Sequence, residues 1–94
     1  MKSRVLNQIE LNIYGQDDEI IATYVNKRIR MGVLERACEL EEELENKTPI
    51  EMLYTLKSVF FEVFDGLTEE HYKLADFRDL MSAYTMVLSM AKNL

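Results

Sequence analysis

The sequence has little of what metal sites, disulfides and catalytic triads are made from. Its 94 residues include one cysteine, Cys38, and one histidine, His71. A single cysteine excludes an intramolecular disulfide and makes a reducing cytoplasm the simplest compartment. No second histidine or cysteine lies at metal-ligand spacing from His71, so we expect neither a metal site nor a cofactor.

Recognisable catalytic motifs are missing as well. There is no glycine-rich phosphate loop, and Asp65-Gly66 lacks the alternating acids of a calcium loop. Cys38 falls on an apolar helical stripe and is expected to be an inert buried thiol. His71 falls early in a short helix and is expected at the surface. We therefore expect no catalytic residue and no enzyme.

Long apolar runs and linkers are also absent. No run approaches the roughly 18 apolar residues of a membrane span, and the N-terminal segment lacks the apolar region of a signal peptide. We expect no membrane association and a single domain over residues 1–94. The net charge of −6 disfavours a nucleic-acid ligand. So small a domain buries a modest core, which makes help from a partner or from homo-oligomerisation plausible.

The clearest helix is expected over residues 49–64. Thr48, Pro49 and Glu51 form the pattern of a capping box with proline in the first turn. Gly66 is expected in the left-handed conformation that stops the helix. The apolar arc of this helix is wide enough for contacts on more than one side.

A β-hairpin is expected over residues 5–25. Ile9, Leu11 and Ile13 alternate with polar residues, and Gly15-Gln16-Asp17-Asp18 is a turn signal before a second strand. Because a lone hairpin is marginal in water, it must rest on the helices or pair with another subunit.

Three further helices are expected over residues 30–45, 68–74 and 77–92. The first is basic at its start and acidic at its end, where Glu41, Glu42 and Glu45 belong to a run of acids. Such a run is typical of a solvated face, but it also suits docking of a basic partner segment. The fold class is therefore mainly α (α+β), an N-terminal β-hairpin followed by three to four packed helices.

The apolar helix faces are the other candidate binding surface. They are rich in phenylalanine and methionine, which suit either a core or an adaptable contact with an apolar helix. The candidate partner-binding residues are Phe60, Phe61, Phe64, Met86, Met90, Glu41, Glu42 and Glu45. Sequence reasoning does not separate those that are core from those that are binding surface.

The order of elements and several short motifs resemble the tail assembly chaperones of long-tailed (siphovirus-type) bacteriophages. The matching stretches run over most of residues 5–88: Val33-Leu34-x-x-Ala37-x-Glu39-Leu40, Thr48-Pro49-x-Glu51, Phe61-Glu62-Val63-Phe64 and Thr68-Glu69-Glu70. The chain departs from the family at Met31-Gly32 and at Leu74-Ala75, where members often carry Ala-Arg and Asp-Gly.

The resemblance implies a viral protein without enzymatic activity. Such chaperones coat the tape-measure protein, keep it soluble and help to recruit tail-tube subunits. They act in the cytoplasm of the bacterial host and are absent from the mature virion. The family often has a longer frameshifted form, and this chain matches the short one.

An alternative of another class is a small acidic inhibitor or regulator that occupies the nucleic-acid-binding site of a host defence or regulatory protein. The acidic run between Glu39 and Glu45 favours this alternative. An acidic mimic should lose its partner as the salt concentration rises, whereas an apolar clamp should not.

Overall fold

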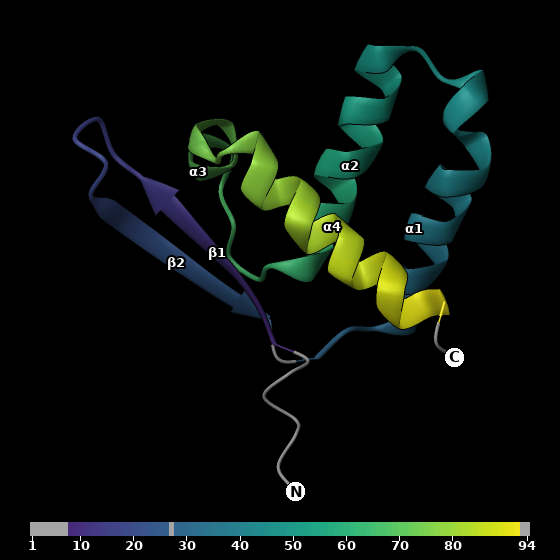
Figure 1. Cartoon of the computed structure of the whole chain (residues 1–94), viewed down its shortest axis with the longest axis horizontal. Coiled ribbons are helices and arrows are strands. Elements are labelled where there is room, and N and C mark those ends of the chain that lie inside the picture. The colour runs from purple at the N-terminus through teal and green to yellow at the C-terminus, as the bar shows by residue number, and fades with distance from the viewer. Residues whose placement is uncertain (1–7, 27, 93–94) are drawn as a thin grey trace, which may run out of the picture.

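A two-stranded hairpin followed by helices makes up the part of the chain that the computed structural model describes, residues 8–26 and 28–92 (Figure 1). The predicted α+β class is confirmed. In chain order the elements are β1 (Ile9–Tyr14), β2 (Ile20–Asn26), α1 (Met31–Glu43), the 3₁₀ turn η2 (Leu44–Asn46), α2 (Pro49–Val63), α3 (Glu69–Leu74) and α4 (Phe77–Lys92).

The two strands pair antiparallel, as the alternating pattern predicts. Ile9, Leu11 and Ile13 of β1 are fully buried, whereas every residue of β2 is half-buried or exposed. The turn between the strands places Asp18 at φ 64°, a conformation that aspartate tolerates better than most residues. Residues 5–7 of the predicted first strand lie outside the described residues.

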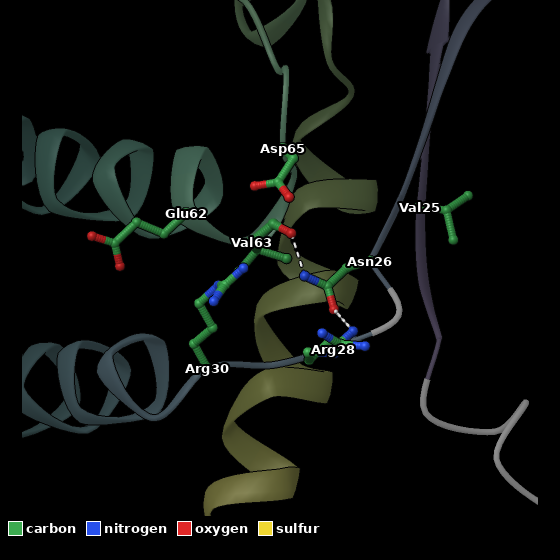
Figure 2. A pocket seen from close by; sticks show the side chains of 7 residues that line it. All are labelled: Val25, Asn26, Arg28, Arg30, Glu62, Val63 and Asp65. Carbon is green, nitrogen blue, oxygen red and sulfur yellow. Dashed lines mark hydrogen bonds between the residues drawn. The ribbon is translucent and has the colours of Figure 1, made fainter.

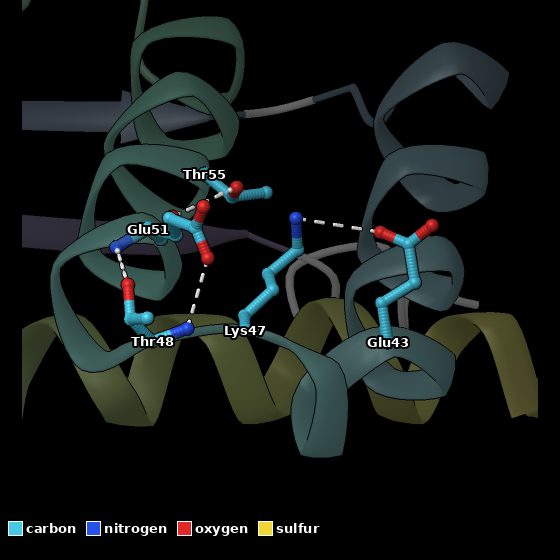
Figure 3. A network of polar contacts seen from close by, with 5 residues as sticks. All are labelled: Glu43, Lys47, Thr48, Glu51 and Thr55. Atoms are coloured by element: carbon cyan, nitrogen blue, oxygen red, sulfur yellow. Dashed lines mark hydrogen bonds and ion pairs between the residues drawn. The ribbon is translucent and has the colours of Figure 1, made fainter.

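A hydrogen-bonded cap starts α2 at the predicted residue (Figure 3). The Glu51 backbone N–H donates to the Thr48 hydroxyl at 3.3 Å, and the Thr48 N–H donates to the Glu51 carboxylate at 2.9 Å. These bonds satisfy backbone groups that the first turn leaves unpaired. The predicted capping box is confirmed, and Gly66 has the expected positive φ of 85°.

The first helix ends earlier than predicted. Its α-helical part stops at Glu43, and Leu44–Asn46 continues as a 3₁₀ turn instead of reaching residue 45 as α-helix. No basic residue lies in the last turn to offset the negative end of the helix dipole. Lys47, just beyond, partly compensates by pairing with Glu43 at 3.4 Å (Figure 3).

The core lies where α4 meets the other elements. α1 and α2 stand side by side and run in opposite directions, while α4 crosses them and contacts both α1 and β1 (Figure 1). The molecule is flat, measuring 42 × 38 × 19 Å. Since a helix with its side chains is about 10 Å across, this thickness holds two layers of elements. In so thin a molecule, several large apolar side chains are exposed to solvent.

Candidate protein-binding groove

An apolar groove lies between the second half of α1, the first half of α2 and the first half of α4. Its volume is about 200 Å³. The lining residues are all apolar or aromatic except one carboxylate: Leu40, Glu41, Leu44, Met52, Leu53, Leu56, Phe77, Met81 and Tyr84. Such a lining suits apolar side chains of a ligand or of another protein.

The floor of the groove is well packed. Leu40, Leu56 and Tyr84 are buried there. The Tyr84 hydroxyl donates weakly to the Ala37 carbonyl at 3.4 Å and to the Glu41 carboxylate at 3.3 Å. Burial, followed by the negative charge of Glu41, raises the pKa of the Tyr84 phenol above its ordinary value. The polar tip of Tyr84 is thus directed at α1, and its ring is left to form an apolar floor.

The rim of the groove exposes large apolar side chains. Phe77, the first residue of α4, is 62% exposed, and Leu53 of α2 is 44% exposed. On the same half of α2, Ile50 and Tyr54 are also exposed. Single exposed apolar residues are ordinary, but several around an apolar hollow are typical of an interaction site.

The groove continues along α4 into a shallower hollow. Phe77 and Met81 line both, and the second hollow extends to Met86. Met86 is partly exposed, as a binding role requires. Met90, one turn further along α4, is half-buried against the core.

Two predicted binding residues belong to the core. Phe60 and Phe64 are 1% and 0% exposed, so these two candidates are the ones that form core rather than exposed surface. Both lie on the side of α2 and its C-cap that packs into the buried cluster. Phe61 is half-buried on another side of α2, where its ring lies perpendicular to the ring of Tyr72 with the two ring centroids 5.8 Å apart.

The predicted acidic residues are all exposed but point to different surroundings. Glu41 lines the groove, whereas Glu42 lines a separate hollow on the other side of α1. Glu45 lies in η2, next to the groove residue Leu44. Glu41 is therefore the one predicted acid that lines the groove, and Glu45 follows the groove residue Leu44 in sequence.

Cys38 and His71 differ from expectation. Cys38 is exposed, because the buried positions of α1 are Val33, Leu34, Ala37 and Leu40, and Cys38 lies beyond that stripe. His71 is half-buried rather than at the open surface. α3 holds it against the hairpin, where His71 Nδ1 and the Tyr24 hydroxyl are 2.6 Å apart.

Away from the groove, a separate hollow of about 250 Å³ lies where the hairpin meets the end of α2 (Figure 2). The Asn26 amide donates to the Val63 carbonyl, and its oxygen accepts from the Arg28 N–H at 2.8 Å. Arg28 and Arg30 line this hollow together with Glu62 and Asp65. Because the hydrogen bond from Asn26 to Val63 joins β2 to the end of α2 here, we interpret this hollow as part of the contact between the two elements.

Of the residues that line the groove, sequence reasoning proposed only Glu41 for binding. It missed Leu40, Leu44, Met52, Leu53, Leu56, Phe77, Met81 and Tyr84. The available signal was that the apolar arcs of residues 49–64 and 77–92 are wider than one neighbour requires. Predicting where the surplus apolar residues form a groove would have required the angle at which the helices cross.

Among the described residues, no group of three or more His, Cys, Asp or Glu could hold a metal ion. None of the helices in that part of the chain is long and apolar enough to cross a membrane. No family model, curated protein or solved structure matches the chain.

Proposed function

We propose that this chain is a tail assembly chaperone of a long-tailed bacteriophage, a non-enzymatic factor that binds apolar helices of the tape-measure protein in the groove between α1, α2 and α4. The observation that carries the proposal is the apolar lining of that groove, with exposed Leu44, Leu53 and Phe77 around it. The proposal is also supported by the resemblance of the order of elements and of several short motifs to those of this chaperone family.

The occupant that fits best is an amphipathic helix with basic residues beside its apolar stripe. Apolar side chains spaced at i, i+3 or i+4 and i+7 would enter the groove and its extension past Met81 toward Met86. Glu41 and Glu45 would attract lysine or arginine at the edge of that stripe. The net charge of −6 favours encounter with a basic segment.

In this role the chaperone acts in the cytoplasm of the bacterial host. It covers apolar helix surface of the tape-measure protein until tail-tube subunits assemble, and it is absent from the mature virion. Apolar contacts supply most of the driving force, because binding removes apolar surface of both proteins from water.

The acidic inhibitor is retained as the second candidate, because Glu39, Glu41, Glu42, Glu43 and Glu45 are all exposed along α1 and η2. It would occupy the nucleic-acid-binding site of a host defence or regulatory protein through these carboxylates. Charge would then dominate the binding, and the apolar groove would contribute little.

A tagged pull-down from phage-producing cells at low and high salt separates the two candidates. The chaperone proposal expects a very long helical tape-measure protein, identified by mass spectrometry and retained at high salt. Recovery of a nuclease or another nucleic-acid-binding protein, lost at high salt, would support the inhibitor instead.

The chain offers a closely matched pair of variants for the same pull-down. Phe77 and Met31 are the first residues of α4 and α1 and are 62% and 61% exposed, but only Phe77 lines the groove. An aspartate is favourable at a helix start, so both variants should fold. Phe77→Asp should lose the tape-measure protein and Met31→Asp should keep it. Equal retention by both variants would place binding elsewhere.

A further inference from the structure

The strand β2 is an open edge that carries neither a proline nor a charged side chain. Within residues 8–26 and 28–92 the sheet has two strands, and β2 pairs only with β1. Edge strands are commonly guarded by a proline or a charged side chain. Ile20–Asn26 has neither; a bulge at Ile21, which can also shield an edge, interrupts its start and leaves Ala22–Asn26 as the regular part of the strand.

The outward face of β2 is also apolar. Ile20, Ile21 and Val25 are each more than two-fifths exposed. β2 forms the outer margin of the molecule, away from α1 (Figure 1), and only its last residues, Val25 and Asn26, lie against the end of α2. A two-stranded sheet is marginal by itself, and additional strands would complete it.

We propose that the chain forms a two-fold symmetric dimer in which β2 of one copy pairs antiparallel with β2 of the other, giving a four-stranded sheet. The occupant of the edge is a second copy because the strand is self-complementary about Thr23, its central residue. A two-fold axis at Thr23 places the same surface of both copies in contact.

The register that this axis imposes pairs suitable side chains. Val25 of each copy lies across from Ile21 of the other, the bulged residue at the start of the strand, and both residues are exposed and β-branched. On the inner face, Tyr24 of each copy faces Ala22 of the other, a large residue against a small one. Cross-strand pairs of β-branched and aromatic side chains stabilise antiparallel sheets.

Charge supports the same register. The turn before β2 carries Asp17, Asp18 and Glu19, all exposed. Arg28, which lines the hollow at the end of α2 together with Glu62 and Asp65, is also exposed and lies just beyond the other end of the strand. Antiparallel pairing about Thr23 brings the acidic turn of each copy to Arg28 of the other. Parallel pairing would put like charges together, so charge selects the symmetric arrangement.

Sedimentation equilibrium on the purified chain tests the dimer. The wild type should give twice the chain mass of 11.1 kDa at micromolar concentration. Thr23→Lys places two lysines face to face on the axis and should raise the dissociation constant by about tenfold or more. A monomeric wild type would overturn the proposal.

A neighbouring substitution controls for folding and for the mode of contact. Asn12 lies opposite Thr23 on β1, and the Thr23 hydroxyl donates to its side chain at 2.8 Å, so Asn12→Lys and Thr23→Lys lose the same hydrogen bond. Asn12→Lys should remain dimeric because β1 is not the pairing edge. Disruption by both variants would indicate face-to-face packing of hairpins and would contradict edge pairing, as would disruption by neither.

Charge reversal tests the register. Arg28→Glu should weaken the dimer, because it faces the acidic turn of the other copy. Adding Asp18→Asn to Arg28→Glu should recover part of the loss, and asparagine tolerates the positive φ of residue 18. If Arg28→Glu leaves the dissociation constant unchanged, the register centred on Thr23 is wrong. None of these variants lies in the groove, so the dimer can fail without affecting the proposed function.

Discussion

The Tyr84 hydroxyl of α4 donates to the Glu41 carboxylate of α1 at 3.3 Å, across 43 positions of the sequence. This contact joins two walls of the groove at its floor. Tyr84 is otherwise buried, and burial is the larger cause of the rise in the pKa of its phenol, with Glu41 adding to it. The titration of Tyr84 therefore reports on the integrity of the groove.

Tyr84 should be the last tyrosine to ionise in the folded chain. The folded state keeps its proton at pH values where the unfolded state releases it, so this contribution to stability is complete below about pH 10 and is lost as the pH rises further. Near-ultraviolet absorbance titration should show a late component that Tyr84→Phe removes. Glu41→Gln should lower the pKa of Tyr84, while Glu42→Gln, on the other side of α1, should not. Ionisation of all tyrosines together would contradict this arrangement.

Truncation to alanine should lower stability strongly at Phe60 and very little at Phe77. Phe60→Ala leaves a cavity in the core and should cost about 3–5 kcal/mol of unfolding free energy. Phe77→Ala, at the open rim of the groove, should change stability by less than about 0.5 kcal/mol. Urea denaturation of both variants measures the difference. Equal losses would show that Phe77 is a core residue and would remove it from the binding site.

The cap of α2 should contribute both stability and acid dependence. Thr48→Ala removes the hydroxyl that accepts from the Glu51 N–H, and loss of such a cap costs about 1 kcal/mol. Hydrogen bonds from Thr48, first from its backbone N–H and then from its side chain, lower the pKa of Glu51 below 4.5. This contribution of Glu51 is present above that pH and is lost as the pH falls through the lowered pKa.

Thr48→Ala should therefore lower the unfolding free energy and also make it depend less on pH in the acidic range. Denaturation of wild type and variant at neutral and acidic pH measures both. Serine supplies the same hydroxyl, so Thr48→Ser should stay close to the wild type. A Thr48→Ala variant as stable as the wild type would mean that the capping bonds are replaced by water at no cost.

Charge reversal at the acidic end of α1 should raise the stability of the folded chain. Glu42→Lys puts a cation in the last turn, between Glu39 and Glu45, and should raise the unfolding free energy by up to about 1 kcal/mol. Glu70→Lys makes the same change in the first turn of α3, where it should destabilise. Thermal melts of both variants measure the two effects. Stabilisation by both would point to net charge rather than to the helix dipole.

The local structure was largely predictable because its signals are local. The capping residues Thr48 and Glu51 lie three apart, and the alternation of Ile9, Leu11 and Ile13 marks a strand with one buried face. Both features have the predicted form. The end of α1 was less predictable, because a run of acids weakens a helix gradually rather than stopping it at one residue.

The binding site could not be predicted to the same degree. Phe60 and Phe61 are neighbours on a helix that is apolar over most of its circumference, yet Phe60 is fully buried and Phe61 is only partly so. Which apolar side chain becomes core depends on how α4 crosses α1 and α2, which is a tertiary property. For the same reason the sequence did not show that Leu53 and Phe77 face one groove.

The most direct test of the chaperone proposal is the soluble fraction of the phage tape-measure protein when it is co-produced with each variant. Wild type and Met31→Asp should keep the tape-measure protein soluble, and Phe77→Asp should leave it in the insoluble fraction although the variant itself is folded and equally abundant. If Phe77→Asp solubilises the tape-measure protein as well as the wild type does, or if the wild type has no effect, the groove is not where a chaperone acts.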